Sequence, residues 1–221
     1  MNAPHPDVLP LPALPRLAQS RLAKLLCAQR RMVLGLVGPP GSGKSTLARQ
    51  LFECCAGAAQ LVPMDGFHLA NVELERLGRV DRKGAPDTFD SAGYVELLRR
   101  VRQQAEADAA LLYAPIFDRR LEEPVAGAIP IHPNTQLIIT EGNYLLHDQG
   151  GWAAVATLLD ETWYVDGDDV LRRERLVQRH VRFGRSLEQA RDWVARTDEA
   201  NARLVAGTRH RADWVFRWDG A

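Results

Sequence analysis

The chain has 221 residues, enough to bury a sizeable core as one α/β domain, and it carries 28 Lys or Arg against 28 Asp or Glu. Because the formal net charge is zero, no global field attracts nucleic acid or an anionic membrane, and neither is expected as a partner. The three cysteines, Cys27, Cys54 and Cys55, are poorly spaced for disulfides or a metal site, which favours reduced thiols and a cytoplasmic location.

The N-terminal stretch is rich in proline and lacks the basic and apolar regions of a signal peptide. Five prolines break any helix there, so residues 1–15 are predicted to be a disordered leader. Residues 16–221 are expected to form a single domain, and no transmembrane segment is expected.

Strand-like and helix-like segments alternate along the rest of the chain. This alternation is typical of a doubly wound, mostly parallel sheet covered by helices on both faces. Residues 66–90 are rich in Gly, Asp and Arg, and 111–131 are expected to be irregular; both are too long for simple connections and are expected to carry function. Strands are predicted near 32–37, 60–64, 137–140, 161–165 and 213–217, and helices near 16–29, 44–56, 91–106, 168–182 and 187–206.

Between the first strand and the next helix lies Gly38-Pro-Pro-Gly-Ser-Gly-Lys-Ser45, which has the phosphate-binding spacing G-x-x-x-x-G-K-[ST]. Its glycines allow backbone N–H groups to surround an anion, and the helix adds the positive end of its dipole. Lys44 is expected to reach the β- and γ-phosphates of ATP, and Ser45 to hold Mg²⁺. The flanking strand and helix argue against an ordinary Gly-rich turn. The predicted nucleotide-binding residues are Gly38, Pro39, Pro40, Gly41, Ser42, Gly43, Lys44, Ser45 and Thr46.

Two carboxylates follow predicted strands. In a doubly wound sheet, ligands bind beyond the carboxyl ends of the strands, so Asp65 is predicted to face the γ-phosphate as the general base. A turn-forming Asp-Gly pair is the alternative. Glu141 closes an apolar strand in the Walker B arrangement and is predicted to bind Mg²⁺, the alternative being a strand-end cap. His68 is a weaker candidate, because a lone loop histidine is more often a surface or packing residue.

Four arginines lie on the helix predicted over 168–182, at spacings that place them along one face: Arg172, Arg175, Arg179 and Arg182. A charged stripe of this kind often only faces solvent. Here it runs into Phe183-Gly-Arg185, which indicates a hinge and hence a lid over about 172–190. A lid supplies cations to the phosphoryl oxygens and excludes water. Arg179 is predicted to be catalytic, and Arg182 and Arg185 to contact the nucleotide.

These motifs resemble, in their order, the P-loop kinases that include uridine kinase, type I pantothenate kinase and phosphoribulokinase. The resemblance covers roughly residues 30–217 and is greatest to a bacterial branch provisionally labelled fructose-transport-system kinase or nucleoside/nucleotide kinase-like protein. It implies a three-layer P-loop NTPase fold with a small helical lid. The segments that carry it are the P-loop, Met64-Asp-Gly-Phe-His68, Arg82-Lys-Gly-Ala-Pro-Asp-Thr-Phe-Asp90, Ala114-Pro-Ile-Phe-Asp118, Glu141-Gly-Asn-Tyr-Leu145, Arg175-Leu-Val-Gln-Arg179 and Asn201 with Thr208-Arg-His-Arg-Ala-Asp213.

The resemblance also implies roles for individual residues. Asp65 is the implied acid–base residue, Glu141 the Mg²⁺-associated carboxylate, and Arg179 to Arg185 the lid arginines. The segment from Thr208 to Arg211 is implied to lie near the nucleotide base, with Arg209 as a contact. Asp90, Phe117, Arg119 and Asn201 are implied to face the phosphate acceptor. The full predicted acceptor set is Phe67, His68, Arg82, Asp90, Phe117, Arg119, Tyr144 and Asn201.

One departure from the family pattern bears on the acceptor. Where uridine and pantothenate kinases have a tyrosine, this chain has Phe117, and Arg119 follows two residues later. Loss of the phenol and gain of a cation favour an acceptor with an anionic group, unless Asp118 and Asp87 neutralise the local cations. A sugar, sugar phosphate or polyol-like metabolite is therefore predicted, with a nucleoside or pantothenate-like acceptor as the alternative.

Other classes of P-loop protein fit the sequence less well. A GTPase switch is disfavoured because no Asn-Lys-x-Asp segment occurs, and a motor or transporter ATPase because no Leu-Ser-Gly-Gly-Gln-like signature occurs. An ATP-binding regulatory protein without acceptor phosphorylation stays open, as does a homodimer.

Overall fold

The computed structural model describes residues 16–104 and 110–217, so the predicted leader lies outside the described residues. Its centre is a five-stranded sheet in the order β2-β5-β1-β6-β7, with every neighbouring pair parallel. The predicted doubly wound, mostly parallel sheet is confirmed. The strands are β1 (Met32–Val37), β2 (Ala59–Pro63), β5 (Leu137–Gly142), β6 (Glu161–Asp166) and β7 (Trp214–Arg217).

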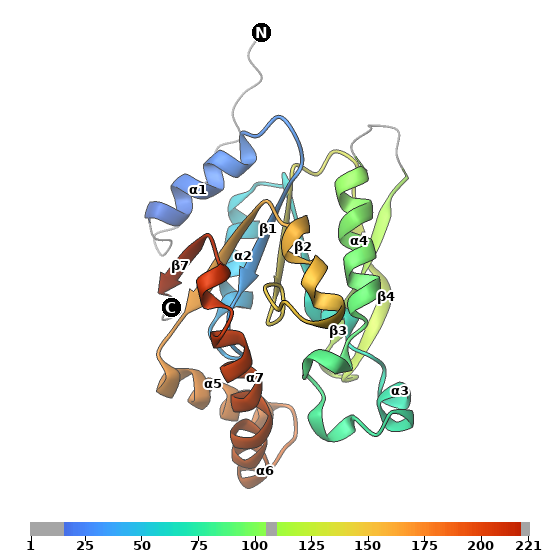
Figure 1. Cartoon of the computed structure of the whole chain (residues 1–221), viewed down its shortest axis with the longest axis vertical. Helices are drawn as coiled ribbons and strands as arrows, with labels where there is room; N and C mark the ends of the chain where they lie inside the picture. Colours follow the sequence, from blue (N-terminus) through green and yellow to red (C-terminus); the bar gives the residue numbers. More distant parts are fainter. Residues whose placement is uncertain (1–15, 105–109, 218–221) are drawn as a thin grey trace.

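Helices cover both faces of the sheet (Figure 1). α1 (Arg16–Leu26) and α2 (Lys44–Cys54) pack on one face, and α4 (Ser91–Gln103) packs on the other. Side chains of β1 alternate between the two cores: Val33 and Val37 join the α4 side, Leu34 and Leu36 the α1–α2 side. Because β1 and β5 are buried almost throughout their length, their sequences are largely apolar, which made them recognisable in the sequence.

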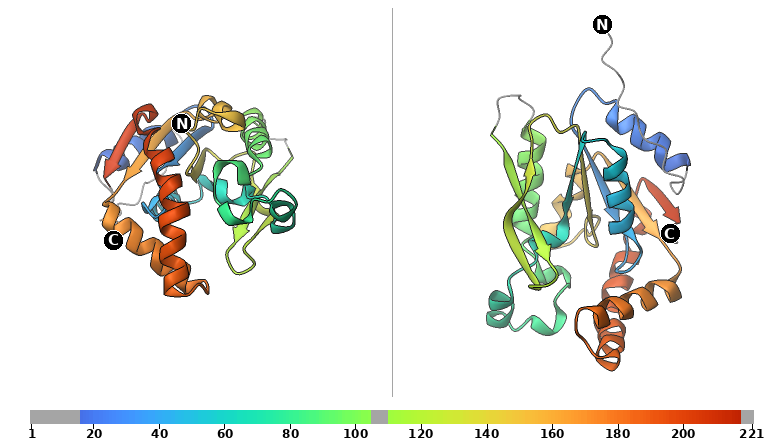
Figure 2. Two further views of the ribbon diagram at one scale, coloured as in Figure 1. Left: turned by 60° about the horizontal axis from the view of Figure 1, so that its bottom comes forward. Right: turned by 180° about the vertical axis from the view of Figure 1, so that it is seen from behind.

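The prediction that residues 111–131 are irregular was wrong. β3 (Leu112–Asp118) and β4 (Glu123–Ile131) form an antiparallel hairpin that packs beside α4 (Figure 2). Pro115, Pro124 and Pro130 suggested a break, but each strand of a two-stranded sheet is an edge, where a missing N–H is tolerated. The register shifts between Ala114 and Ile116, at Pro115.

The stretch 66–90 consists of short helical turns: η1 (Met64–Phe67), α3 (Asn71–Arg76), η2 (Val80–Arg82) and η3 (Pro86–Thr88). Gly66, in η1, lies against the hairpin. A Cβ at this position would come within 2.3 Å of the Pro115 carbonyl oxygen, so only glycine permits this approach. The turn that carries Asp65 is thereby held against β3.

The predicted lid region contains α5 (Asp169–Arg182) and α6 (Leu187–Trp193). A single helix was predicted over 187–206, but a π-helical turn, η6 (Val194–Asp198), separates α6 from α7 (Glu199–Ala206). Such insertions are frequent at functional sites. Figures 1 and 2 show this group and the α3 segment on opposite sides of the carboxyl edge of the sheet.

The remaining short helices connect the sheet strands: η4 (Gly150–Ala154), η5 (Ala156–Leu158) and η7 (Arg209–Arg211). Across the described ranges, every helix is too short or too polar to cross a membrane.

Candidate active site

The predicted phosphate-binding loop connects β1 to the first residue of α2, Lys44. The N–H groups of the first helical turn have no partners within the helix and are available to an anion. Gly41 has φ 78°, and a Cβ there would lie 2.8 Å from the Arg172 carbonyl oxygen of α5. The loop therefore needs glycine both for its backbone conformation and for its contact with α5.

The strand order brings the two predicted carboxylates to this loop. β5 lies between β1 and β2, so Glu141 lies between the loop and Asp65, which follows β2 in η1. The Ser45 Oγ donates a hydrogen bond to Glu141 Oε1 at 3.0 Å. Motifs far apart in the sequence thus meet at one edge of the sheet.

Asp65 is paired with a cation in this site. Arg119 Nη2 donates to Asp65 Oδ2 at 2.8 Å. Burial alone would raise the pKa of Asp65, but the surrounding positive charge lowers it below its usual value. The charges that most lower the pKa of Asp65 are, in decreasing order of effect, those of His68, Arg119 and Lys44. Asp65 is therefore an ionised carboxylate engaged by a guanidinium.

Lys44 and Glu141 experience opposite effects of burial. Burial lowers the pKa of the Lys44 ammonium, while the charges of Glu141 and Asp65 act to raise it. Burial raises the pKa of Glu141, and Lys44 acts against this. Each charge therefore stabilises the other in a poorly solvated place, where a phosphate or cation interacts strongly.

Two pockets meet at the loop. One, of about 190 Å³, is lined by the loop and by α5, and includes Thr46 and Arg175. The other, of about 210 Å³, extends toward Asp65 and the hairpin. Lys44, Ser45 and Arg179 line both pockets and so lie at their boundary. The larger pocket also includes Pro40, His68, Phe117, Arg119, Arg185 and Asn201 from the predicted set.

Comparison with known proteins agrees with this geometry. Residues 33–219 match the Phosphoribulokinase / Uridine kinase family. The chain belongs to this family. The kinase is therefore an ATP-dependent P-loop phosphotransferase with an alcohol group as acceptor, and the resemblance inferred from the sequence is confirmed.

Individual relatives match over most of their length. The kinase is 37% identical to Escherichia coli (strain K12) YggC over 193 residues, 85% of this chain and 78% of that protein. It is 33% identical over 197 residues to a Schizosaccharomyces pombe protein provisionally named uridine kinase C227.14, covering 84% of this chain and 83% of that protein. A solved structure provisionally named a fructose transport system kinase, from Silicibacter sp. TM1040, has a TM-score of 0.80 at 36% identity, covering 90% of the kinase and 97% of that chain.

Four predicted acceptor contacts do not line the larger pocket of the kinase: Phe67, Tyr144, Asp90 and Arg82. Phe67 and Tyr144 are buried in the core, and the Tyr144 hydroxyl donates to the Gly84 carbonyl oxygen. Asp90 caps the N-terminus of α4, where its side chain accepts from the Gly93 N–H at 2.8 Å. Packing already engages the side chains of Phe67 and Tyr144, and capping engages that of Asp90. These residues therefore support the walls of the pocket and do not line it.

Three arginines that were predicted to contact a ligand also lie outside the two pockets. Arg82 pairs with Asp87 at 2.8 Å, as the sequence analysis had allowed. Arg209 pairs with Asp166 at 3.3 Å, and Arg182 is exposed at the end of α5. None of these three arginines lines either pocket.

The pocket includes residues that the sequence analysis missed. Asn143 follows Glu141 by two positions, and its buried Oδ1 has no hydrogen-bond partner. His180 Nε2 lies 2.7 Å from Asp198 Oδ2, which links α5 to η6. Of these residues, only Asn143 could have been found from the sequence, because it lies two positions after the Walker B carboxylate. The other lining residues outside the predicted set are Lys83, Gly84, Phe89, Glu122, Phe183 and Trp193.

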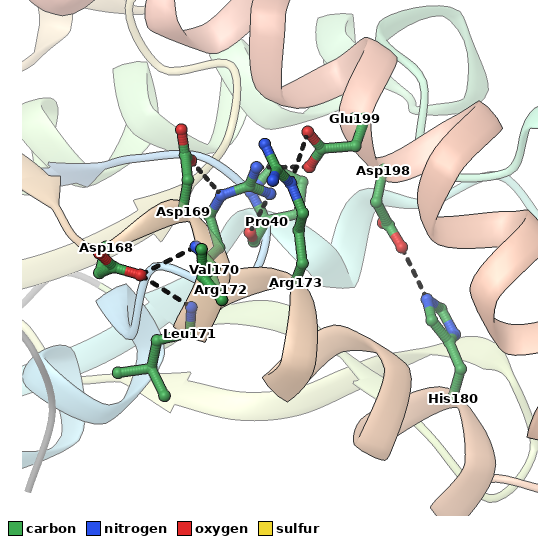
Figure 3. A network of polar contacts seen from close by, with 10 residues as sticks. All are labelled: Pro40, Asp168, Asp169, Val170, Leu171, Arg172, Arg173, His180, Asp198 and Glu199. Carbon is green, nitrogen blue, oxygen red and sulfur yellow. Dashed lines mark hydrogen bonds and ion pairs between the residues drawn. The ribbon is translucent and has the colours of Figure 1, made fainter.

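Arg172, the first arginine of the predicted stripe, is buried, and its side chain points into the protein interior (Figure 3). Its guanidinium donates to the Pro40 carbonyl oxygen at 3.2 Å and to Asp169 Oδ1 at 3.0 Å, and it also pairs with Glu199. Glu199 accepts a second bond, at 3.1 Å, from Arg173. Arg172 therefore ties α5 and α7 to the phosphate-binding loop.

Replacing this arginine is expected to destabilise the kinase. In Arg172→Ala, Glu199 and the Pro40 carbonyl lose a buried charged donor, so the free energy of unfolding should fall by about 3 kcal/mol. The exposed Arg173→Ala variant is the matched control and should lose less than about 1 kcal/mol. Urea unfolding measures both, and equal losses would contradict the assigned role of Arg172.

Proposed function

We propose that this kinase transfers the γ-phosphoryl group of Mg²⁺-ATP to a hydroxyl of a sugar phosphate, a sugar acid or a related small anionic metabolite. The charge around Asp65 is the observation that carries the proposal. Five Lys or Arg residues line the larger pocket against three carboxylates, Asp65, Glu122 and Asp198. Lys44 and Arg179 are assigned to the phosphates of ATP, which leaves three cations on the acceptor side of the pocket. An acceptor with its own negative charge can pair with these cations, whereas a neutral acceptor cannot. The cations are Lys44, Lys83, Arg119, Arg179 and Arg185.

Ser45, at the boundary of the two pockets, and its hydrogen-bond partner Glu141 suit a magnesium ion. Ser45 and Glu141 offer a hydroxyl and a carboxylate oxygen 3.0 Å apart. Mg²⁺ prefers such hard oxygen ligands, and in phosphoryl transfer it takes only one or two from the protein and the rest from phosphates and water. In residues 16–104 and 110–217, no group of three or more His, Cys, Asp or Glu could hold a metal ion by itself. The ion would neutralise charge on the β- and γ-phosphates.

Asp65 is the proposed acceptor of the proton. The acceptor hydroxyl gives its proton to Asp65, its oxygen forms the new bond to the γ-phosphorus, and the β–γ bridging oxygen leaves with ADP. Lys44 and Arg179, at the boundary of the two pockets, are placed to stabilise the phosphoryl group as it passes.

A nucleoside acceptor is the second candidate, because aromatic rings also line the pocket. Phe117 lies 4.6 Å from His68, between ring centroids, and His68 lies 4.0 Å from Phe89. However, Lys83 and Arg119 lie over Phe117 at 5.2 and 5.6 Å from its centroid. These cations compete with a base for the ring face, which favours the anionic acceptor.

Several expectations from the sequence stay predictions. They are a small-molecule acceptor with no nucleic acid or membrane partner, a cytoplasmic location and a homodimer as an open alternative. A single domain over 16–221, with acceptor-site insertions at 66–90 and 111–131 and a lid at about 172–190, is likewise predicted.

A coupled assay of ADP release with a panel of acceptors tests the function. Sugar phosphates, sugar acids, neutral sugars, nucleosides and pantothenate are compared at fixed Mg²⁺-ATP. An anionic acceptor is expected to give the largest kcat/KM, and Lys44→Ala should abolish its signal, which excludes a contaminating kinase. Stimulation by neutral nucleosides alone would establish a nucleoside kinase. ATP binding without stimulation by any acceptor would favour a regulatory ATP-binding protein.

A further inference from the structure

The contact between Arg119 and Asp65 affects when Asp65 can accept a proton. Asp65 Oδ2 accepts a hydrogen bond at 2.8 Å from Arg119, so the guanidinium takes one of the lone pairs with which this carboxylate could accept the proton of a hydroxyl. A carboxylate held by a guanidinium is also a weaker base. In this arrangement the predicted general base is therefore engaged by Arg119 and weakened.

Arg119 is held in place by few interactions. Its side chain is 39% exposed, and among the described residues Asp65 is the only carboxylate within 4 Å of it. The nearby carboxylate of Asp118 instead binds the Arg120 and Leu121 N–H groups of its own turn. Arg119 is thus free to rotate toward a stronger partner in the pocket.

The same pocket offers a place for such a partner. Lys83 Nζ and the Arg119 guanidinium both lie over the Phe117 ring. Within the described part of the chain, Lys83 Nζ donates only to neutral oxygens, Asn71 Oδ1 at 2.6 Å and the Glu122 carbonyl oxygen at 2.5 Å. Arg185 lines the pocket from the lid side, stacked 3.7 Å above the Trp193 ring centroid. A phosphate or carboxylate between these cations can bind Arg119 in two-point geometry, which a single Asp65 oxygen does not provide.

We propose that Arg119 is a gate on the general base: it occupies Asp65 in the absence of acceptor, and the anionic group of the acceptor draws it away and releases Asp65. The proposal rests on the proposed function, because it requires an acceptor with an anionic group. It predicts that the anion increases kcat as well as affinity. It also predicts that ATP hydrolysis by water is suppressed until an anion arrives.

Inorganic phosphite separates the anionic group from the acceptor and provides the test. ADP release by the full chain with Mg²⁺-ATP, without acceptor, is measured as phosphite is added. In the wild type, phosphite is expected to stimulate hydrolysis by about tenfold, the equivalent of one charge-assisted hydrogen bond. Arg119→Ala is expected to hydrolyse ATP faster without phosphite and to show no stimulation. Asp65→Asn should abolish hydrolysis under both conditions.

Matched variants distinguish the gate from a loss of structure. Arg120→Ala removes the next arginine, whose side chain is 88% exposed, and should behave as the wild type. Arg119→Gln, which keeps a long polar side chain, should reproduce the behaviour of Arg119→Ala at an unchanged midpoint of thermal unfolding.

Two failures can be told apart. A wild-type enzyme that phosphite does not stimulate, or an Arg119→Ala variant that phosphite stimulates equally, overturns the gate even if sugar phosphates are phosphorylated. In that case Arg119 only binds the acceptor and changes KM alone. Absence of any acceptor in the panel overturns the proposed function, whereas phosphite stimulation lost in Arg119→Ala supports the gate independently of that result.

Discussion

Asp65→Asn is expected to lower kcat by about 10²–10⁴ and to leave ATP affinity within a few-fold. The amide keeps the shape of the side chain and can still accept a hydrogen bond, but it cannot take the proton of the acceptor hydroxyl. Affinity for ATP should change little, because the phosphate-binding loop and Lys44, rather than Asp65, hold the phosphates. Steady-state kinetics with the best acceptor, together with a direct measurement of nucleotide binding, separate the two quantities.

A second aspartate provides the control for this experiment. Asp81 has a side chain 82% exposed and lies outside both pockets, so Asp81→Asn should leave kcat within about twofold of the wild type. A near-normal kcat for Asp65→Asn would assign Asp65 to the turn, the alternative that its Asp-Gly sequence had left open.

Arg179→Ala is expected to lower kcat by about 10³, with a smaller increase in the KM for ATP. Arg179 lines both pockets, so its charge lies where the phosphoryl group is transferred. Burial lowers the pKa of its guanidinium, with Arg119 adding to this effect. A poorly solvated cation is stabilised by an incoming phosphoryl group, and cations in this role contribute about 10³–10⁵ to kcat.

Arg191→Ala is a suitable comparison, because Arg191 is exposed on α6 and lines neither pocket. It should leave both constants near the wild-type values. If Arg179→Ala raised the KM for ATP and left kcat unchanged, Arg179 would bind the ground state of ATP, and another group would stabilise the transition state.

The sequence by itself determined the features that depend on local backbone chemistry. The spacing of glycines, Lys44 and Ser45 defines the phosphate-binding loop, because its conformation arises within eight residues between one strand and one helix. Nearly continuous apolar segments identified the parallel strands. Parallel strands end at the same edge of a sheet, and this rule was sufficient to predict that Asp65 and Glu141 lie near the loop.

The tertiary structure decided which side chains of a similar pattern face the site. Helical periodicity placed Arg172 and Arg179 in one stripe, but packing of α5 against α7 buries Arg172 beneath the loop and leaves Arg179 at the pockets. The prolines of β3 and β4 concealed a hairpin, because their effect depends on whether a strand has neighbours on both sides. The pairing of Arg119 with Asp65 spans 54 positions and depends on how that hairpin packs against Gly66. Such pairings arise from the packing of distant segments, and no local pattern in the chain encodes them.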